Sequence, residues 1–157
     1  MTRADDVLSK HGAHLRARLA EMGKHELDRV RNIALALPEV SEQLSHGAPC
    51  FFIRDKRALC YYHDNHRGDG RISLWCPAPP GVQADLVSND PQRFFKPPAS
   101  ANGTFSQWLG VFLDTIGENI VDWNEITAIL EDAYRTAAPT ALVARLVTRK
   151  SSRPTRD

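Results

Sequence analysis

Residues 49–77 read PCFFIRDKRALCYYHDNHRGDGRISLWCP, and this stretch gives the clearest indication of the fold class. It holds three runs rich in aromatic and apolar residues, at Cys50–Arg54, Arg57–His63 and Arg71–Cys76. Runs of about five to seven residues have the length of strands rather than helices. Clusters of Asp, Asn and Gly between such runs are typical of hairpins. The stretch therefore predicts a three-stranded antiparallel meander, with a turn at Asp55–Lys56 and a longer loop at Asp64–Gly70.

Helices are expected before and after this meander in the sequence. Apolar residues at three- and four-residue steps predict a helix from Lys24 to Leu37, which Pro38 ends. Gln107–Leu113 predicts a further strand, whereas Glu39–Ala48 is expected to be a polar connector. Helices followed by a meander, a strand and a final helix indicate an α+β fold, with an antiparallel sheet packed against helices.

The final helix is expected to begin at Asp122. An Asp at the N-cap, with a Glu three residues later, resembles a capping box. Trp123, Ile126, Leu130 and Tyr134 then fall on one helical face. We expect that face to be buried against the meander.

The two ends of the chain differ from its centre. Residues 1–23 predict an N-terminal helical extension, whose narrow apolar stripe makes it a candidate for docking on a partner chain. Residues 24–146 form the expected α+β domain, and residues 147–157 are typical of a basic disordered tail. The first residues carry charges throughout and lack an apolar core, so we expect no signal peptide and a cytoplasmic location.

Composition sets limits on function. The chain has 157 residues, for which one domain is the expectation, and 20 basic against 19 acidic residues give a formal charge of +1. A dedicated nucleic-acid binder is often more basic, so the overall charge gives no support to that function. Three cysteines, Cys50, Cys60 and Cys76, with no CxxC pair, predict buried thiols rather than disulfides.

The sequence offers two candidate reactive sites, and each lacks a feature that its chemistry needs. His63 and His66, with a carboxylate close by, could ligate zinc, but a closed zinc site needs more ligands than this loop offers. Cys50 or Cys60 with His46 could pair a nucleophile and a base, but a reactive cysteine needs an electropositive, partly exposed site. No common catalytic or phosphate-binding motif is present. We therefore expect no catalytic residues, no metal and no cofactor.

Two binding hypotheses follow from the remaining polar residues. Basic side chains crowd both expected hairpins and could meet the phosphates of a duplex, although hairpin tips also carry charge simply for solubility. A small cleft beside the Pro97–Pro98 segment could instead hold a ligand. The expected phosphate-binding residues are Arg54, Lys56, Arg57, Arg67 and Arg71. The expected pocket residues are His46, Lys96, Trp108, Tyr134 and Arg135.

Several landmarks occur together in one order along the chain. They are ALALPE at 34–39, HGAPCF at 46–51, the 71–76 strand, DPQRFF at 90–95, WLGV at 108–111, and the helix from Asp122–Trp123 to Ala138–Pro139. In this order they resemble the MmcQ/YjbR family of small bacterial proteins, over about residues 27–146. The resemblance implies a compact α+β fold similar to CyaY, with a double wing, and a DNA-binding label that rests on analogy of fold.

Three stretches depart from that family pattern. They are the extra N-terminal helix, a longer Ser100–Ser106 segment before Trp108, and the basic tail. From the resemblance and the local charge we expect a non-catalytic protein that binds DNA with weak sequence preference. The main alternative is a small-ligand or protein-interaction module with no nucleic-acid role. The sequence indicates neither an oligomeric state nor a particular ligand.

Overall fold

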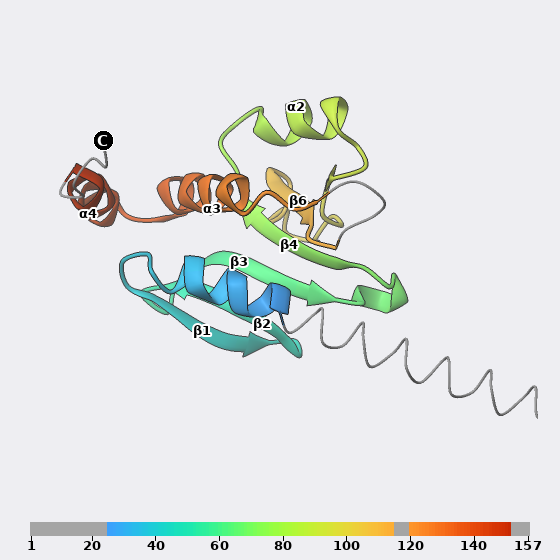
Figure 1. Cartoon of the computed structure of the whole chain (residues 1–157), viewed down its shortest axis with the longest axis horizontal. Coiled ribbons are helices and arrows are strands. Elements are labelled where there is room, and N and C mark those ends of the chain that lie inside the picture. Colours follow the sequence, from blue (N-terminus) through green and yellow to red (C-terminus); the bar gives the residue numbers. More distant parts are fainter. Residues whose placement is uncertain (1–24, 115–119, 152–157) are drawn as a thin grey trace, which may run out of the picture.

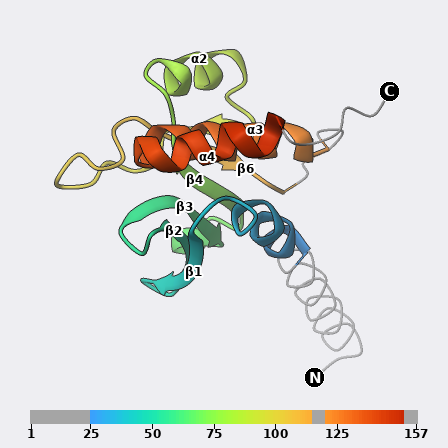
Figure 2. The same ribbon diagram turned by 90° about the vertical axis from the view of Figure 1, so that its left-hand side faces the viewer.

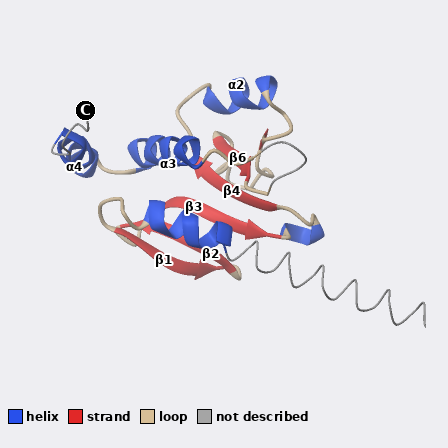
Figure 3. Cartoon of the chain, viewed as in Figure 1, coloured by secondary structure: helices blue, strands red, loops and turns tan. Residues whose placement is uncertain are grey.

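The computed structural model describes residues 25–114 and 120–151. Its centre is a six-stranded antiparallel sheet with the strand order β1-β2-β3-β4-β6-β5 (Figures 1 and 3). The expected meander forms the middle of this sheet, and the α+β class is confirmed. The strands are β1 (Val40–Ser45), β2 (Ala48–Ile53), β3 (Arg57–Asp64), β4 (Ile72–Pro77), β5 (Phe94–Phe95) and β6 (Trp108–Phe112).

Strand β1 replaces the polar connector expected at Glu39–Ala48. It pairs with β2 at the edge of the sheet, and none of its residues is fully buried. Edge strands often carry polar residues that discourage pairing with other chains, which hides the apolar alternation of a strand. The turn that follows, His46–Gly47, has φ values of 51° and 79°. Such a left-handed pair is typical of a two-residue hairpin turn.

Helices cover one face of the sheet and one of its ends. They are the helix at residues 25–34, α2 (Val82–Asn89), α3 (Trp123–Ala137) and α4 (Thr140–Ser151). The α2 helix packs by β5 and β6, and both Figure 1 and Figure 2 place it far from β1. The Asp122 side chain accepts hydrogen bonds from the backbone N–H groups of Asn124 and Glu125, so the expected N-cap of α3 is confirmed.

We call the face of the sheet that contacts α3 the core face. Ile126, Leu130 and Tyr134 are fully buried, and α3 packs against β3 and β4 as expected. The Tyr134 hydroxyl donates a hydrogen bond of 2.8 Å to the carbonyl oxygen of Pro38, just beyond the helix at residues 25–34. This bond joins the two helical segments that cover the core face.

The expected terminal segments lie mostly outside the described residues. That is the case for the N-terminal extension at residues 1–23 and for residues 152–157 of the expected tail. The α4 helix continues to Ser151, so the backbone is helical past Leu146. Within residues 25–114 and 120–151, no helix has the length and apolar character needed to cross a membrane.

Candidate functional site

The face opposite the core face carries a group of aromatic side chains. Tyr61 and His63 are two residues apart on β3, so they point to the same side of the sheet. Trp75 is the partner of Tyr61 on β4, and Trp108 follows on β6. Phe105 joins them from the loop before β6. We call Tyr61, His63, Trp75, Phe105 and Trp108 the aromatic cluster.

Phe105 fixes its loop onto the sheet. Its ring centre lies 5.9 Å from that of Tyr61, 5.6 Å from Trp75 and 4.9 Å from Trp108, in edge-to-face arrangements. Aromatic rings favour this geometry, and each such pair adds about 0.5–1.5 kcal/mol beyond area burial. The buried Gln83 side chain also donates hydrogen bonds to the carbonyl oxygens of Ser106, at 3.2 Å, and Trp108, at 2.6 Å. The loop is therefore anchored at its C-terminal end.

A cavity of about 850 Å³ opens beside the aromatic cluster. Its walls come from the β1–β2 turn, the end of β3 and the loop that follows it, and the Pro98–Ser100 segment. Small-molecule sites usually have about 300–1,000 Å³ and mostly apolar walls with a few polar groups. The lining residues are Leu27, Gly47, Ala48, Pro49, Tyr61, Tyr62, Trp75, Pro98, Ala99 and Phe105, together with the polar Ser45, His46, His63, Asp64, His66, Arg67 and Ser100.

His63 is the central polar residue of the site. Its ring centre lies 4.1 Å from Trp75 and 4.4 Å from His66. Burial lowers the pKa of His63 most, the nearby His66 lowers it as well and Asp69 acts in the opposite direction, and together they bring it to about 4. The ring is therefore neutral at pH 7. Its Nε2 atom is buried and has no hydrogen-bond partner among the described residues, a rare state for a polar atom in a native protein.

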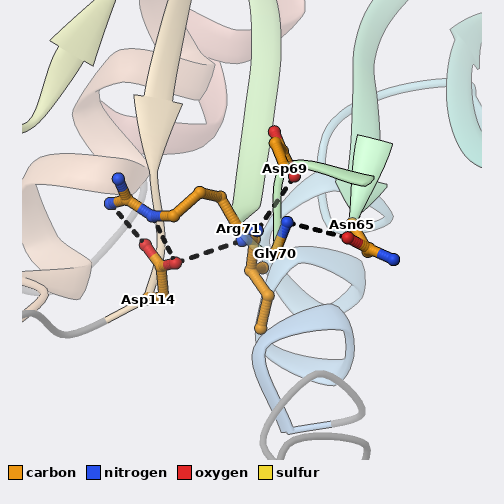
Figure 4. Close-up of polar contacts among 6 residues, drawn as sticks. Asn65, Asp69, Gly70, Arg71 and Asp114 are labelled. Carbon is orange, nitrogen blue, oxygen red and sulfur yellow. Dashed lines mark hydrogen bonds and ion pairs between the residues drawn. The ribbon is translucent and has the colours of Figure 1, made fainter. Parts of the chain in front are cut away.

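The loop after β3 is braced by hydrogen bonds at its base (Figure 4). Asn65 Oδ1 accepts from the Gly70 N–H at 2.7 Å, and Asp69 Oδ1 accepts from the Arg71 N–H at 2.9 Å. Arg71 itself donates two hydrogen bonds, of 2.7 and 2.9 Å, to the Asp114 carboxylate. These contacts shape the loop that carries His66 and Arg67 before any ligand binds, which lowers the entropic cost of binding.

The five expected pocket residues do not converge. His46 lines the cavity, and Trp108 belongs to the aromatic cluster. Tyr134 is buried on the core face, and Arg135 makes an ion pair with Asp132 on α3. Lys96 is not among the lining residues of the cavity. None of the residues that line the cavity comes from α3.

The expected phosphate-binding residues form two groups. The turn that carries Arg54 and Lys56 precedes β3, and the loop that carries Arg67 follows it. The two groups therefore lie at opposite ends of an eight-residue strand. At about 3.3 Å per residue, this strand separates them by more than 20 Å.

Three of these basic residues already have partners. Arg54 pairs with Glu39 at 2.9 Å, and Arg71 with Asp114. Arg57 donates a hydrogen bond of 3.2 Å to the carbonyl oxygen of Ala137. Among the described residues, Lys56 and Arg67 make no ion pair or hydrogen bond through their side chains. These two cations are therefore the most available of the five.

The cysteines are buried, as expected. Burial raises the pKa of Cys50 to about 11 and that of Cys76 to about 12, and it raises the pKa of Cys60 strongly. All three are protonated thiols at neutral pH, which makes them poor nucleophiles. In the part of the chain that the structure describes, no three His, Cys, Asp or Glu side chains are grouped so that they could hold a metal ion.

Sequence reasoning missed Tyr61, Trp75 and Phe105 as site residues. The spacing of Tyr61 and His63 was a usable signal, because alternate residues share a face of a strand. The position of Trp75 depends on the β3–β4 register, which the length of the loop alone does not set. Phe105 stands in a polar segment, and its contacts arise only from the tertiary fold.

Comparison with known proteins gives one match. A family model described as YjbR matches residues 35–136, which is more than half of the chain. Apart from Leu27, all the cavity-lining residues lie within this range. A search of curated proteins found no match, and a search of solved structures found none either.

Proposed function

The chain belongs to the YjbR family, and we propose that it binds a small, largely apolar organic molecule, without catalysis, in the cavity beside the aromatic cluster. The single observation that carries this proposal is the cavity itself, of about 850 Å³, which opens beside the aromatic cluster and is bordered by two braced loops. Its volume and its mainly apolar lining fit a small-molecule site.

The neutral state of His63 supports an apolar ligand. His63 is neutral at pH 7, because burial holds its pKa near 4. An apolar ring placed on Tyr61, His63 or Trp75 therefore meets no buried charge, which would be costly to leave without water. Ring-on-ring contacts would add the stacking preference of aromatic pairs.

The chemistry of the nearby groups supports binding rather than catalysis. Covalent catalysis needs an activated nucleophile, and a thiol is activated by a lowered pKa or an adjacent base. The pKa values of Cys50, Cys60 and Cys76 are all raised instead.

DNA binding stays a prediction, and the geometry supports it less. Arg54 and Arg71 are held in ion pairs, and the two hairpin groups lie at opposite ends of β3. Each phosphate contact gives a slope of about −0.9 in log affinity against log salt. With Lys56 and Arg67 as the available cations of the two hairpins, we expect a slope no steeper than about −2 for a chain that lacks the basic tail, since the tail is a separate source of phosphate contacts. Fluorescence anisotropy with a duplex at several salt concentrations measures it, and a slope near −4 would favour the hairpin hypothesis.

The ligand proposal is tested by filling the cavity. Ser100 lines it, so Ser100→Trp should occupy the space and abolish binding of a simple planar probe such as indole. Thr104→Trp is the matched control, because Thr104 is exposed on the same loop and does not line the cavity. Isothermal titration calorimetry should show indole binding to the parent and to the Thr104 variant alone. Equal binding to both variants would place the site elsewhere, and no binding of indole to the parent chain would count against the proposal.

A further inference from the structure

We infer that the ligand of this cavity is an aromatic anion and that Arg67 recognises its negative charge. The inference rests on the proposed function and adds the ligand's charge to it. The aromatic rings of Tyr61, Trp75 and Phe105 and the guanidinium group of Arg67 line the same cavity. A planar ring that carries a carboxylate or another acidic group matches both parts.

Arg67 is available for an anion. It lines the cavity, and among the described residues its side chain makes no ion pair or hydrogen bond. Most of the other arginines near the sheet are occupied, as Arg54 is by Glu39, Arg71 by Asp114 and Arg31 by Glu42. Guanidinium groups bind carboxylate and phosphate groups through bidentate hydrogen bonds, and the N–H groups of Arg67 are available for such bonds.

Two carboxylates lie near Arg67, and among the described residues neither forms an ion pair with it. Asp64 also lines the cavity, but among the described residues it forms no ion pair with Arg67, and it alternates with His63 along β3, so it starts from the face of the strand that carries Tyr62. There, burial and then the Asp64 carboxylate raise the pKa of Tyr62, which has the same orientation. Asp69 accepts the Arg71 N–H and is not among the lining residues.

The surroundings of Arg67 are prepared for recognition. Its backbone is left-handed, with φ 52°, in the short 3-10 turn His66–Gly68. Such conformations cost energy in residues other than glycine and are often found at ligand clamps. The hydrogen bonds of Asn65 and Asp69 hold the base of this loop. The imidazole groups of His46 and His66 line the same rim and can donate further N–H groups to an anion.

The test compares three probes that share one ring and differ in charge. They are indole-3-propionate, an anion; indole, which is neutral; and tryptamine, a cation. Calorimetry on the full chain should show indole-3-propionate binding about tenfold tighter than indole, the effect of one charge-assisted hydrogen-bonded pair. Tryptamine should bind most weakly.

Two variants locate the effect. Arg67→Gln should remove the preference for the anion, so that indole-3-propionate and indole bind this variant with similar affinity. Lys56→Gln makes the same change in net charge at the opposite end of β3 and should keep the preference. Equal affinity of the parent for the three probes, or an equal loss in both variants, would overturn the role of Arg67 while leaving the cavity as a ligand site. Failure of all three probes to bind would instead contradict the proposed function.

Discussion

The two faces of the sheet are built from the same strands but have different contents. The core face buries aliphatic residues under the helices, with Leu74 and Leu130 both at 0% exposure. The opposite face carries the aromatic cluster and is covered by a loop, which leaves a cavity of about 850 Å³. Alternation along β3 directs Tyr62 to the core face and Tyr61 and His63 to the aromatic face, and Tyr62 also borders the cavity at the end of the strand.

We infer from this difference that the core face serves stability and the aromatic face serves binding. Close packing on the core face supplies stability, because each buried apolar side chain there is removed from water. The aromatic face keeps a hollow and a buried polar atom, His63 Nε2, that has no hydrogen-bond partner in the described part of the chain, and both of these features reduce stability. A protein retains such features where they serve binding. Substitutions on the two faces should therefore affect different properties.

The largest expected effect is on the core face. Leu130→Ala should lower the free energy of unfolding by about 2–5 kcal/mol, because it leaves a cavity under α3. Leu35→Ala is the control, since Leu35 is 46% exposed, and it should cost under about 0.5 kcal/mol. Urea denaturation followed by circular dichroism measures both. Similar losses in the two variants would show that α3 does not hold the core.

A pH-dependent effect is expected on the aromatic face. Burial lowers the pKa of folded His63 from 6.5 to about 4, so between these pH values the unfolded state binds more protons. Stability from this group is complete above about pH 6.5 and is lost as the pH falls toward 4, at no more than about 1.4 kcal/mol per pH unit. Solvent screening of the partly exposed ring reduces this figure.

His63→Phe keeps an aromatic ring and removes the titrating group. The unfolding free energy of the parent minus that of this variant should therefore decrease as the pH falls from 6.5 to 4.5, because only the parent loses the contribution of neutral His63. Taking the difference cancels the titration of carboxyl groups elsewhere. A difference that does not change with pH would mean that the His63 ring is not buried in a neutral state.

The smallest expected effect is a difference in stability between Phe variants of two tyrosines, one on each face. Tyr134→Phe removes the hydrogen bond to the Pro38 carbonyl on the core face and should cost about 0.5–1.5 kcal/mol. Tyr61→Phe should cost close to nothing, because the Tyr61 hydroxyl makes no hydrogen bond to the described residues. Thermal unfolding of the two variants checks this, and a reversed order would contradict the assignment of the two faces.

The sequence predicts the core face better than the aromatic face. The spacing of Ile126, Leu130 and Tyr134 is a local pattern, so it identifies a buried helical face without the rest of the fold. Strand β1 is missed because an edge strand is mostly polar. The cavity is missed because it depends on the β3–β4 register and on where the Phe105 loop folds back, which are tertiary features.

The three tryptophans give the most direct test of the central claim, that a ligand binds on the aromatic face. Trp75 lies in the aromatic cluster beside the cavity, Trp108 lies in the cluster behind Tyr61 and Phe105, and Trp123 lies on α3 across the sheet. Their indole N–H signals can be resolved in ¹⁵N-labelled protein and assigned with single Trp→Phe variants. On titration with indole-3-propionate, the Trp75 signal should shift most and saturate, while the Trp123 signal stays in place. Saturating shifts at Trp123 without any at Trp75, or no shift at all, would contradict the account.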